Sequence, residues 1–138
     1  KVLIDPNLFS TDGKVALSGL AITEDGKLAA YGVATAGSDW QEWRLRDVDS
    51  GQDLSDKIEW VKFSAPAFTV DGKGFFYSRF DKPDDAAKLT QVNYYHKLYY
   101  HKIGTPQDED ILIYHRPDQK EWNFYPETTR DGRYLVIS

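Results

Sequence analysis

Residues 69–78 read TVDGKGFFYS and carry the pattern on which the fold prediction depends. A Ser/Thr-x-Asp-Gly-Lys/Arg turn leads here into a run of apolar and aromatic residues. An Asp-Gly pair between two such runs is a strong hairpin signal, because the Asp side chain can accept hydrogen bonds from the N–H groups of the turn and Gly readily adopts a positive φ. The segment therefore predicts a tight turn at Asp71-Gly72, followed by a β-strand.

The same pattern recurs along the chain, as STDGKVAL from residue 10, TEDGKLAAYG from residue 23 and TRDGRYLVIS from residue 129. The structural turn residues are thus Asp12, Gly13, Asp25, Gly26, Asp71, Gly72, Asp131 and Gly132. Asp-Gly alone would permit four independent hairpins. However, Asp25 and Asp71 are 46 residues apart, and Asp71 and Asp131 are 60 apart. Such spacing, with room for four short strands per repeat, is typical of β-propeller blades.

We therefore predict an all-β fold, a partial β-propeller of stacked four-stranded antiparallel sheets. The sequence accommodates about two full blades and parts of two more. Residues 15–64 and 65–116 each supply a complete blade. We expect residues 1–9 to form the outer strand of a preceding blade and residues 122–138 to begin the next one. Residues 84–92 follow Pro83 and lack a long helical apolar period, which favours a loop insertion over a helix.

The composition narrows the range of partners and compartments. The net charge is −5, which argues against nucleic acid as a partner and against a polybasic membrane anchor. No apolar run approaches the roughly 20 residues needed to span a bilayer, so no membrane association is expected. The chain has no cysteine, which excludes disulfides and leaves a cytoplasmic or periplasmic location open. It also has no methionine, so we expect a processed product or a piece of a longer chain.

No motif for metal binding or catalysis stands out. His96 and His101 are five residues apart and would point to opposite faces of a strand, so His96, His101 and His115 are interpreted as ordinary strand histidines. The acidic run from Asp108 to Asp110 is interpreted as a solvated turn. There is no G-x-S-x-G motif, and Ser38 is interpreted as a turn residue. We therefore predict no metal, no cofactor and no catalytic residue.

Two longer stretches carry a resemblance. WVKFSAPAFTVDGKGFFYSRF, from residue 60, and NYYHKLYYHKIGTPQDEDILIYHRPDQKEW, from residue 93, resemble the β-propeller of the prolyl oligopeptidase family, serine peptidases of the α/β-hydrolase clan. The likeness covers essentially the whole chain. It implies a propeller segment that gates substrate access and walls the cavity of an enzyme that cleaves short peptides after proline. By position, Leu45 and Ala65 match cavity-facing places in that family.

The resemblance also implies partners. These are the missing propeller blades, the separate α/β-hydrolase domain that carries the Ser, Asp and His triad, and short proline-containing peptides. The chain alone is expected to be inactive as a peptidase. A second hypothesis is a non-enzymatic β-sheet module that binds peptides or proteins. The two hypotheses differ in whether the ends of the sheet stack are covered. An independent module should bury both ends, whereas an open propeller arc leaves apolar faces and unpaired edge strands that favour self-association.

Overall fold

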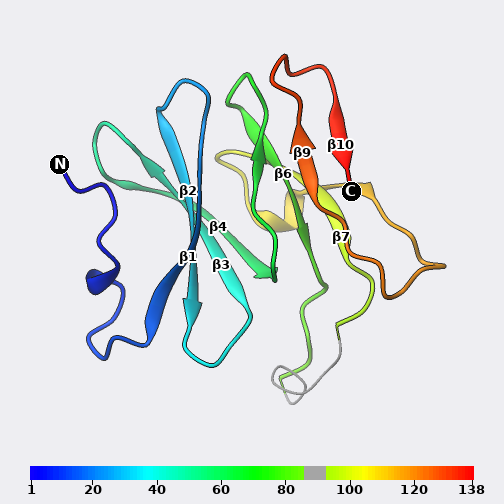
Figure 1. Cartoon of the computed structure of the whole chain (residues 1–138), viewed down its shortest axis with the longest axis horizontal. Helices are drawn as coiled ribbons and strands as arrows, with labels where there is room; N and C mark the ends of the chain where they lie inside the picture. The colour runs from blue at the N-terminus through cyan, green and yellow to red at the C-terminus, as the bar shows by residue number, and fades with distance from the viewer. Residues whose placement is uncertain (86–92) are drawn as a thin grey trace.

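The computed structural model describes residues 1–85 and 93–138 (Figure 1). Most of the loop insertion expected at residues 84–92 therefore lies outside the described residues. The first blade is a four-stranded antiparallel sheet with its strands in chain order. These strands are β1 (Val15–Ile22), β2 (Leu28–Thr35), β3 (Gln41–Asp47) and β4 (Asp53–Val61).

The second blade repeats this topology. Its strands are β5 (Ala67–Phe68), β6 (Gly74–Arg79), β7 (Lys97–Lys102) and β8 (Ile111–Tyr114), with a short 3₁₀ helix, η2 (Gln107–Glu109), before β8. A third unit contains only the hairpin of β9 (Pro126–Thr128) and β10 (Leu135–Ile137). Figure 1 shows the sheets stacked side by side in chain order. The all-β, partial-propeller prediction is confirmed.

The repeated turns explain why the hairpins form where they do. Between β5 and β6, Thr69 Oγ1 donates to Asp71 Oδ1 at 2.6 Å, and the same oxygen accepts the N–H of Lys73 at 3.0 Å. Gly72 has a φ of 69°, a conformation that costs other residues energy. Equivalent hydrogen bonds form at the turns that follow β1 and β9. In these three hairpins, the turn motif supplies its own hydrogen-bond partners.

The turn at Asp12-Gly13 does not join two strands of one sheet. The N–H of Lys14 still bonds Asp12 Oδ1 at 3.1 Å, but this turn leads into β1 from a segment that contains no strand. The outer strand expected at residues 1–9 is absent, since residues 6–8 form the 3₁₀ helix η1 (Pro6–Leu8). A strand needs a neighbouring strand to satisfy its backbone groups, and none of the strands in residues 1–85 and 93–138 pairs with this segment.

The N-terminal segment instead covers the outer face of the first blade. Phe9 stacks on Tyr31 with ring centroids 5.9 Å apart. Arg46 Nη1 donates to the carbonyl of Leu3 at 2.7 Å, and Lys1 Nζ donates to the carbonyl of Asp49 at 2.8 Å. These contacts hide Tyr31, which would otherwise lie on an open sheet face.

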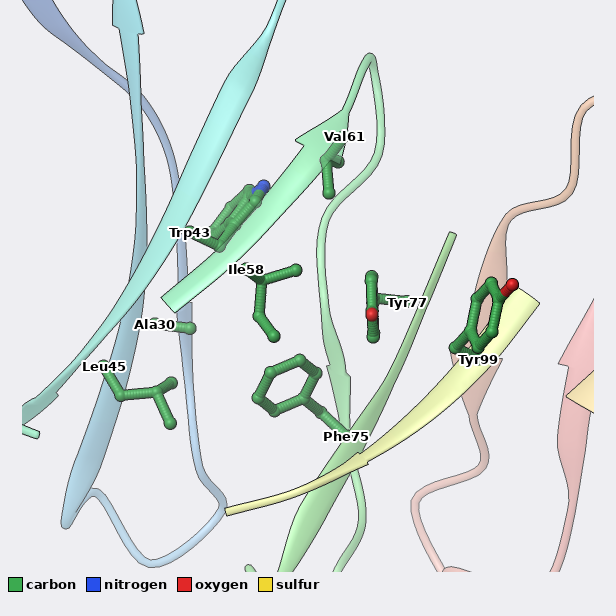
Figure 2. Close-up of a cluster of buried hydrophobic side chains, with 8 residues drawn as sticks. All are labelled: Ala30, Trp43, Leu45, Ile58, Val61, Phe75, Tyr77 and Tyr99. Atoms are coloured by element: carbon green, nitrogen blue, oxygen red, sulfur yellow. The ribbon is translucent and has the colours of Figure 1, made fainter. Parts of the chain in front are cut away.

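The main hydrophobic core lies between the two blades (Figure 2). The first blade contributes side chains from β2, β3 and β4, and the second from β6 and β7. These are Ala30, Trp43, Leu45, Ile58, Val61, Phe75, Tyr77 and Tyr99. Trp43 lies over Gly19 and Gly32, where a Cβ atom would meet its ring at 2.8 and 3.0 Å. The glycines on β1 and β2 thus leave room for a large aromatic ring against the sheet.

Candidate functional site

The first strands of the three units meet along one side of the stack. β5 contacts both β1 and β9, and Thr128 Oγ1 on β9 donates to the carbonyl of Phe68 on β5 at 2.9 Å. Each of these strands lies at the edge of its own sheet, and among the described residues no strand pairs with its other edge. We call this row of β1, β5 and β9 the inner row, and it is the candidate functional site.

A hollow of about 550 Å³ lies at the end of the inner row where the strands enter their Asp-Gly turns. All three units contribute to its lining. The lining residues are Ala21, Ile22, Glu24, Pro66, Phe68, Thr69, Val70, Thr128, Thr129 and Arg130. The surface therefore combines apolar side chains and threonines with one carboxylate and one guanidinium.

A second hollow, of about 360 Å³, lies where β5 and β9 begin. Ala65 is exposed there, beside Phe63, Ser64 and the segment from Tyr125 to Glu127. Phe63 is 70% exposed and has a φ of 52°. A bulky residue rarely adopts a positive φ, and such strain often occurs at functional positions. This positive φ could not be predicted from the sequence, because the local pattern specifies no turn type.

The turn carboxylates beside the first hollow have a structural role. The Thr69 hydroxyl and the Lys73 N–H lower the pKa of Asp71. At the equivalent position in the next turn, the Thr129 hydroxyl and the Arg133 N–H lower the pKa of Asp131. Both carboxylates therefore remain ionised and engaged by their own turns, and neither has the raised pKa of a general acid.

Leu45 does not lie where the family resemblance places it. It is on β3, away from the inner row, and its side chain points toward Ile58 and Phe75 in the core between the blades (Figure 2). Only 2% of its surface is exposed. The expectation that Leu45 lines a cavity is therefore wrong for the structure described here, because the neighbouring blade covers its side chain.

The histidines are more specialised than the sequence suggested. His101 on β7 is fully buried, with one ring nitrogen on Asp56 and the other on Asp110. The prediction that residues 108–110 form a solvated turn is therefore correct only in part, because the Asp110 side chain is 1% exposed whereas Asp108 is exposed. The pairing of Tyr100 with Ile111 places Asp110 beside His101, so a strict hairpin register could have revealed this contact. The contact with Asp56, 45 residues away, has no local signal.

His96 lies in the opposite kind of environment. Its Nδ1 accepts the N–H of Phe124 at 2.9 Å, and burial lowers its pKa to about 4. His96 is therefore neutral near pH 7. In the described part of the chain, no group of three or more His, Asp or Glu side chains is arranged to hold a metal ion. The same residues contain no helix long and apolar enough to cross a membrane.

Comparison with known sequences and structures identifies the family that shares this arrangement of β-sheets. Residues 1–138 match the family described as prolyl oligopeptidase, N-terminal beta-propeller domain. The chain belongs to this family. Prolyl oligopeptidase A of Galerina marginata is 39% identical over 155 residues, which cover 99% of this chain and 21% of that protein. The prolyl endopeptidase of Elizabethkingia miricola is 37% identical over 138 residues, or 100% of this chain and 19% of that protein.

A solved prolyl oligopeptidase structure has the same fold over this region. Prolyl oligopeptidase B from Galerina marginata, bound to a 35-residue hydrolysis and macrocyclization substrate, superposes with a TM-score of 0.88 at 33% identity. The match covers 96% of this chain and 20% of that one. The chain thus spans about a fifth of the length of its prolyl oligopeptidase relatives. Its two blades and the following hairpin are propeller elements of this serine peptidase family.

Proposed function

We propose that this chain forms part of the wall of a substrate chamber in a prolyl oligopeptidase and limits which peptides enter it. The observation that carries the proposal is the inner row, where β1, β5 and β9 border two hollows. In a propeller, the first strand of each blade surrounds a central channel. A narrow channel of this kind admits short peptides and excludes folded proteins.

Phe63 and Ala65 are the residues that we propose contact the peptide. Both are exposed at the second hollow, on the link between β4 and β5. An exposed aromatic ring offers a large apolar contact area, and the small Ala65 side chain beside it leaves room for a ligand. The strained backbone at Phe63 fits this assignment, because strain is tolerated where function requires a particular side-chain direction.

The chemistry itself is proposed to take place on a separate α/β-hydrolase domain. The two buried histidines are engaged by partners within the fold, His101 by two carboxylates and His96 by a backbone N–H. The remaining blades and the hydrolase domain are the proposed partners of this chain, and short proline-containing peptides are the proposed substrates of the complete enzyme. Exclusion of water by the closed chamber would strengthen the electrostatic interactions at that distant site.

The test compares Phe63→Ala with Trp122→Ala in the complete protein that carries this sequence. Trp122 is also an exposed aromatic residue, but it lines neither hollow. With a proline-containing chromogenic peptide, Phe63→Ala should lower kcat/KM by about five- to tenfold, which corresponds to about 1 kcal/mol of lost contact energy. Trp122→Ala should leave kcat/KM within about twofold of the unmodified enzyme. Equal effects of the two substitutions would refute the assignment of Phe63.

The 138-residue chain alone provides a second test. It should not hydrolyse the same peptide at any concentration. Turnover that a serine-directed phosphonate blocks would contradict the proposal that the catalytic groups lie elsewhere.

A further inference from the structure

The most unusual polar arrangement outside the inner row is a buried triad of Asp56, His101 and Asp110. His101 Nε2 lies 2.7 Å from Asp56 Oδ2, and its Nδ1 lies 2.6 Å from Asp110 Oδ1. All three side chains are at most 1% exposed. Asp56 belongs to β4 of the first blade, whereas His101 and Asp110 belong to the second. The imidazole ring therefore connects the two blades.

The geometry favours a doubly protonated ring. An ionised carboxylate can only accept hydrogen bonds, so a ring nitrogen that faces one must carry a proton. Both nitrogens of His101 face carboxylate oxygens, so the ring carries both protons when the two carboxylates are ionised. The contrast with His96 is direct, since His96 Nδ1 accepts a backbone N–H and must be unprotonated.

The triad is part of a larger contact between β4 and residues 104–110. Asp56 Oδ2 also accepts the N–H of Gly104 at 2.8 Å. The Gln107 side chain accepts the Glu59 N–H at 3.0 Å and donates to the Glu59 carbonyl at 3.1 Å. We call these bonds and the triad the blade tie. The tie attaches one loop of the second blade to the outer strand of the first.

We propose that the blade tie is a proton-dependent latch, which holds the two blades together while His101 carries both ring protons and loosens when one proton is lost. Loss of a proton would leave a ring lone pair facing a carboxylate oxygen, in a site with no access to solvent. That repulsion would push either Asp56 or Asp110 away from the ring. Because Asp56 also holds Gly104, the loop would be released with it.

The ionisable groups around the His101 ring support loosening of the blade tie on loss of a proton. They are Asp56 on β4, Asp110 before β8 and Tyr77 on β6, whose hydroxyl donates to Asp110 Oδ2 at 2.6 Å. Burial and the Asp110 carboxylate raise the pKa of Tyr77, so Tyr77 remains a donor. Burial alone would lower the pKa of His101, but the hydrogen bonds to Asp110 and Asp56 outweigh it and raise the pKa.

The sign of the pH effect follows from the raised pKa. A histidine with a raised pKa in the folded state stabilises that state fully below its unfolded pKa of about 6.5. This stabilisation is lost as the pH rises through the folded pKa. The latch is thus closed in mildly acidic solution and opens on the alkaline side.

The test is nuclear magnetic resonance of the 138-residue chain with ¹⁵N-labelled histidine, titrated from pH 5 to 10. Both ring nitrogens of His101 should keep the chemical shifts of imidazolium well above pH 6.5, whereas His96 should show one unprotonated nitrogen throughout the neutral range. A His101 ring with one unprotonated nitrogen at pH 6 would overturn the proposal.

Amide hydrogen exchange tests the opening itself. The reporters are the Gly104 and Glu59 amides, which bond across the blades, and the control is the Thr23 amide, which bonds Leu28 within the first blade. At pH 6, His101→Gln should lower the protection of both reporters by about tenfold or more, the effect expected for loss of a buried charge-assisted hydrogen bond. His115→Gln serves as the matched histidine control and should leave the reporters unchanged.

In the unmodified chain, the protection of the two reporters, corrected for intrinsic exchange, should fall as His101 deprotonates, while that of Thr23 stays constant. Reporter protection that does not change through the His101 titration would overturn the latch. This measurement requires no variant, so it decides the matter even if His101→Gln fails to fold.

Discussion

Leu45→Ala is a sensitive probe of how the two blades pack. Leu45 is 2% exposed in the core between the blades, where it packs with Ile58 and Phe75. Replacing a buried Leu by Ala removes apolar contact area and leaves a cavity, at a cost of about 2–5 kcal/mol. Rigid strands surround this site on both sides, so we expect little collapse and a loss of about 3 kcal/mol. This is a large part of the roughly 5–15 kcal/mol that stabilises a typical domain.

The assay is urea unfolding followed by tryptophan fluorescence. For an m-value of about 1.5 kcal/mol/M, a loss of about 3 kcal/mol lowers the midpoint by about 2 M urea. Leu8→Ala is the matched control, because Leu8 is 82% exposed and should change stability by less than about 0.5 kcal/mol. If Leu45→Ala destabilises the chain no more than Leu8→Ala does, Leu45 is not in a core between blades, and the stacking described here is wrong.

Three further predictions follow from individual contacts. Gly74→Ala should destabilise the chain by about 1–3 kcal/mol in urea unfolding, because the added Cβ would collide with the His101 carbonyl oxygen; unchanged stability would contradict the close approach of β6 and β7. Thr69→Val should cost about 1–2 kcal/mol, because its hydroxyl bonds both Asp71 and Gly74, and Thr129→Val should cost a similar amount at the equivalent turn. The pKa of His96 is about 4 in the folded chain and about 6.5 in the unfolded chain, so the unfolded chain binds a proton first as the pH falls. The free energy of unfolding should therefore fall by up to about 3 kcal/mol between pH 7 and pH 4. His96→Asn should flatten this pH dependence in urea midpoints measured from pH 4 to 7.

The repeated turns made the fold predictable from the sequence. Thr69, Asp71 and Gly72 form a turn through bonds within a few residues, so the local pattern contained all that was needed. The 46-residue interval between Asp25 and Asp71 then indicated four strands per blade. The N-terminal segment was predicted incorrectly, because its path depends on Tyr31 and Arg46, more than 20 residues away.

The candidate site was less predictable, because it also depends on contacts between residues that lie far apart in the sequence. Ala65, matched by resemblance to a cavity-facing place, borders a hollow, and its contact with substrate stays a prediction. Leu45 occupies the core, because burial depends on which face of β3 the second blade covers. The contact of His101 with Asp56 joins residues 45 positions apart, so only the packing of one blade on the other creates it. The positive φ of Phe63 likewise belongs to the link between blades and follows no local turn motif.

The apolar surface at the two ends of the stack leads to the most direct test. At one end, Leu20 on β1 is about half exposed, and at the other end Tyr134 and Val136 are exposed on the β9–β10 hairpin. In the part of the chain that the structure describes, β10 pairs only with β9. Such faces and edges favour association with further β-sheets. We therefore expect the isolated chain to associate with copies of itself.

The measurement is the molar mass in solution by size-exclusion chromatography with light scattering, over a wide range of protein concentrations. An open propeller arc should show a mass that rises with concentration above the 15.8 kDa of one chain, toward a dimer or larger assembly. A constant mass of 15.8 kDa at every concentration would contradict the account, since it would mean that the ends of the stack are closed.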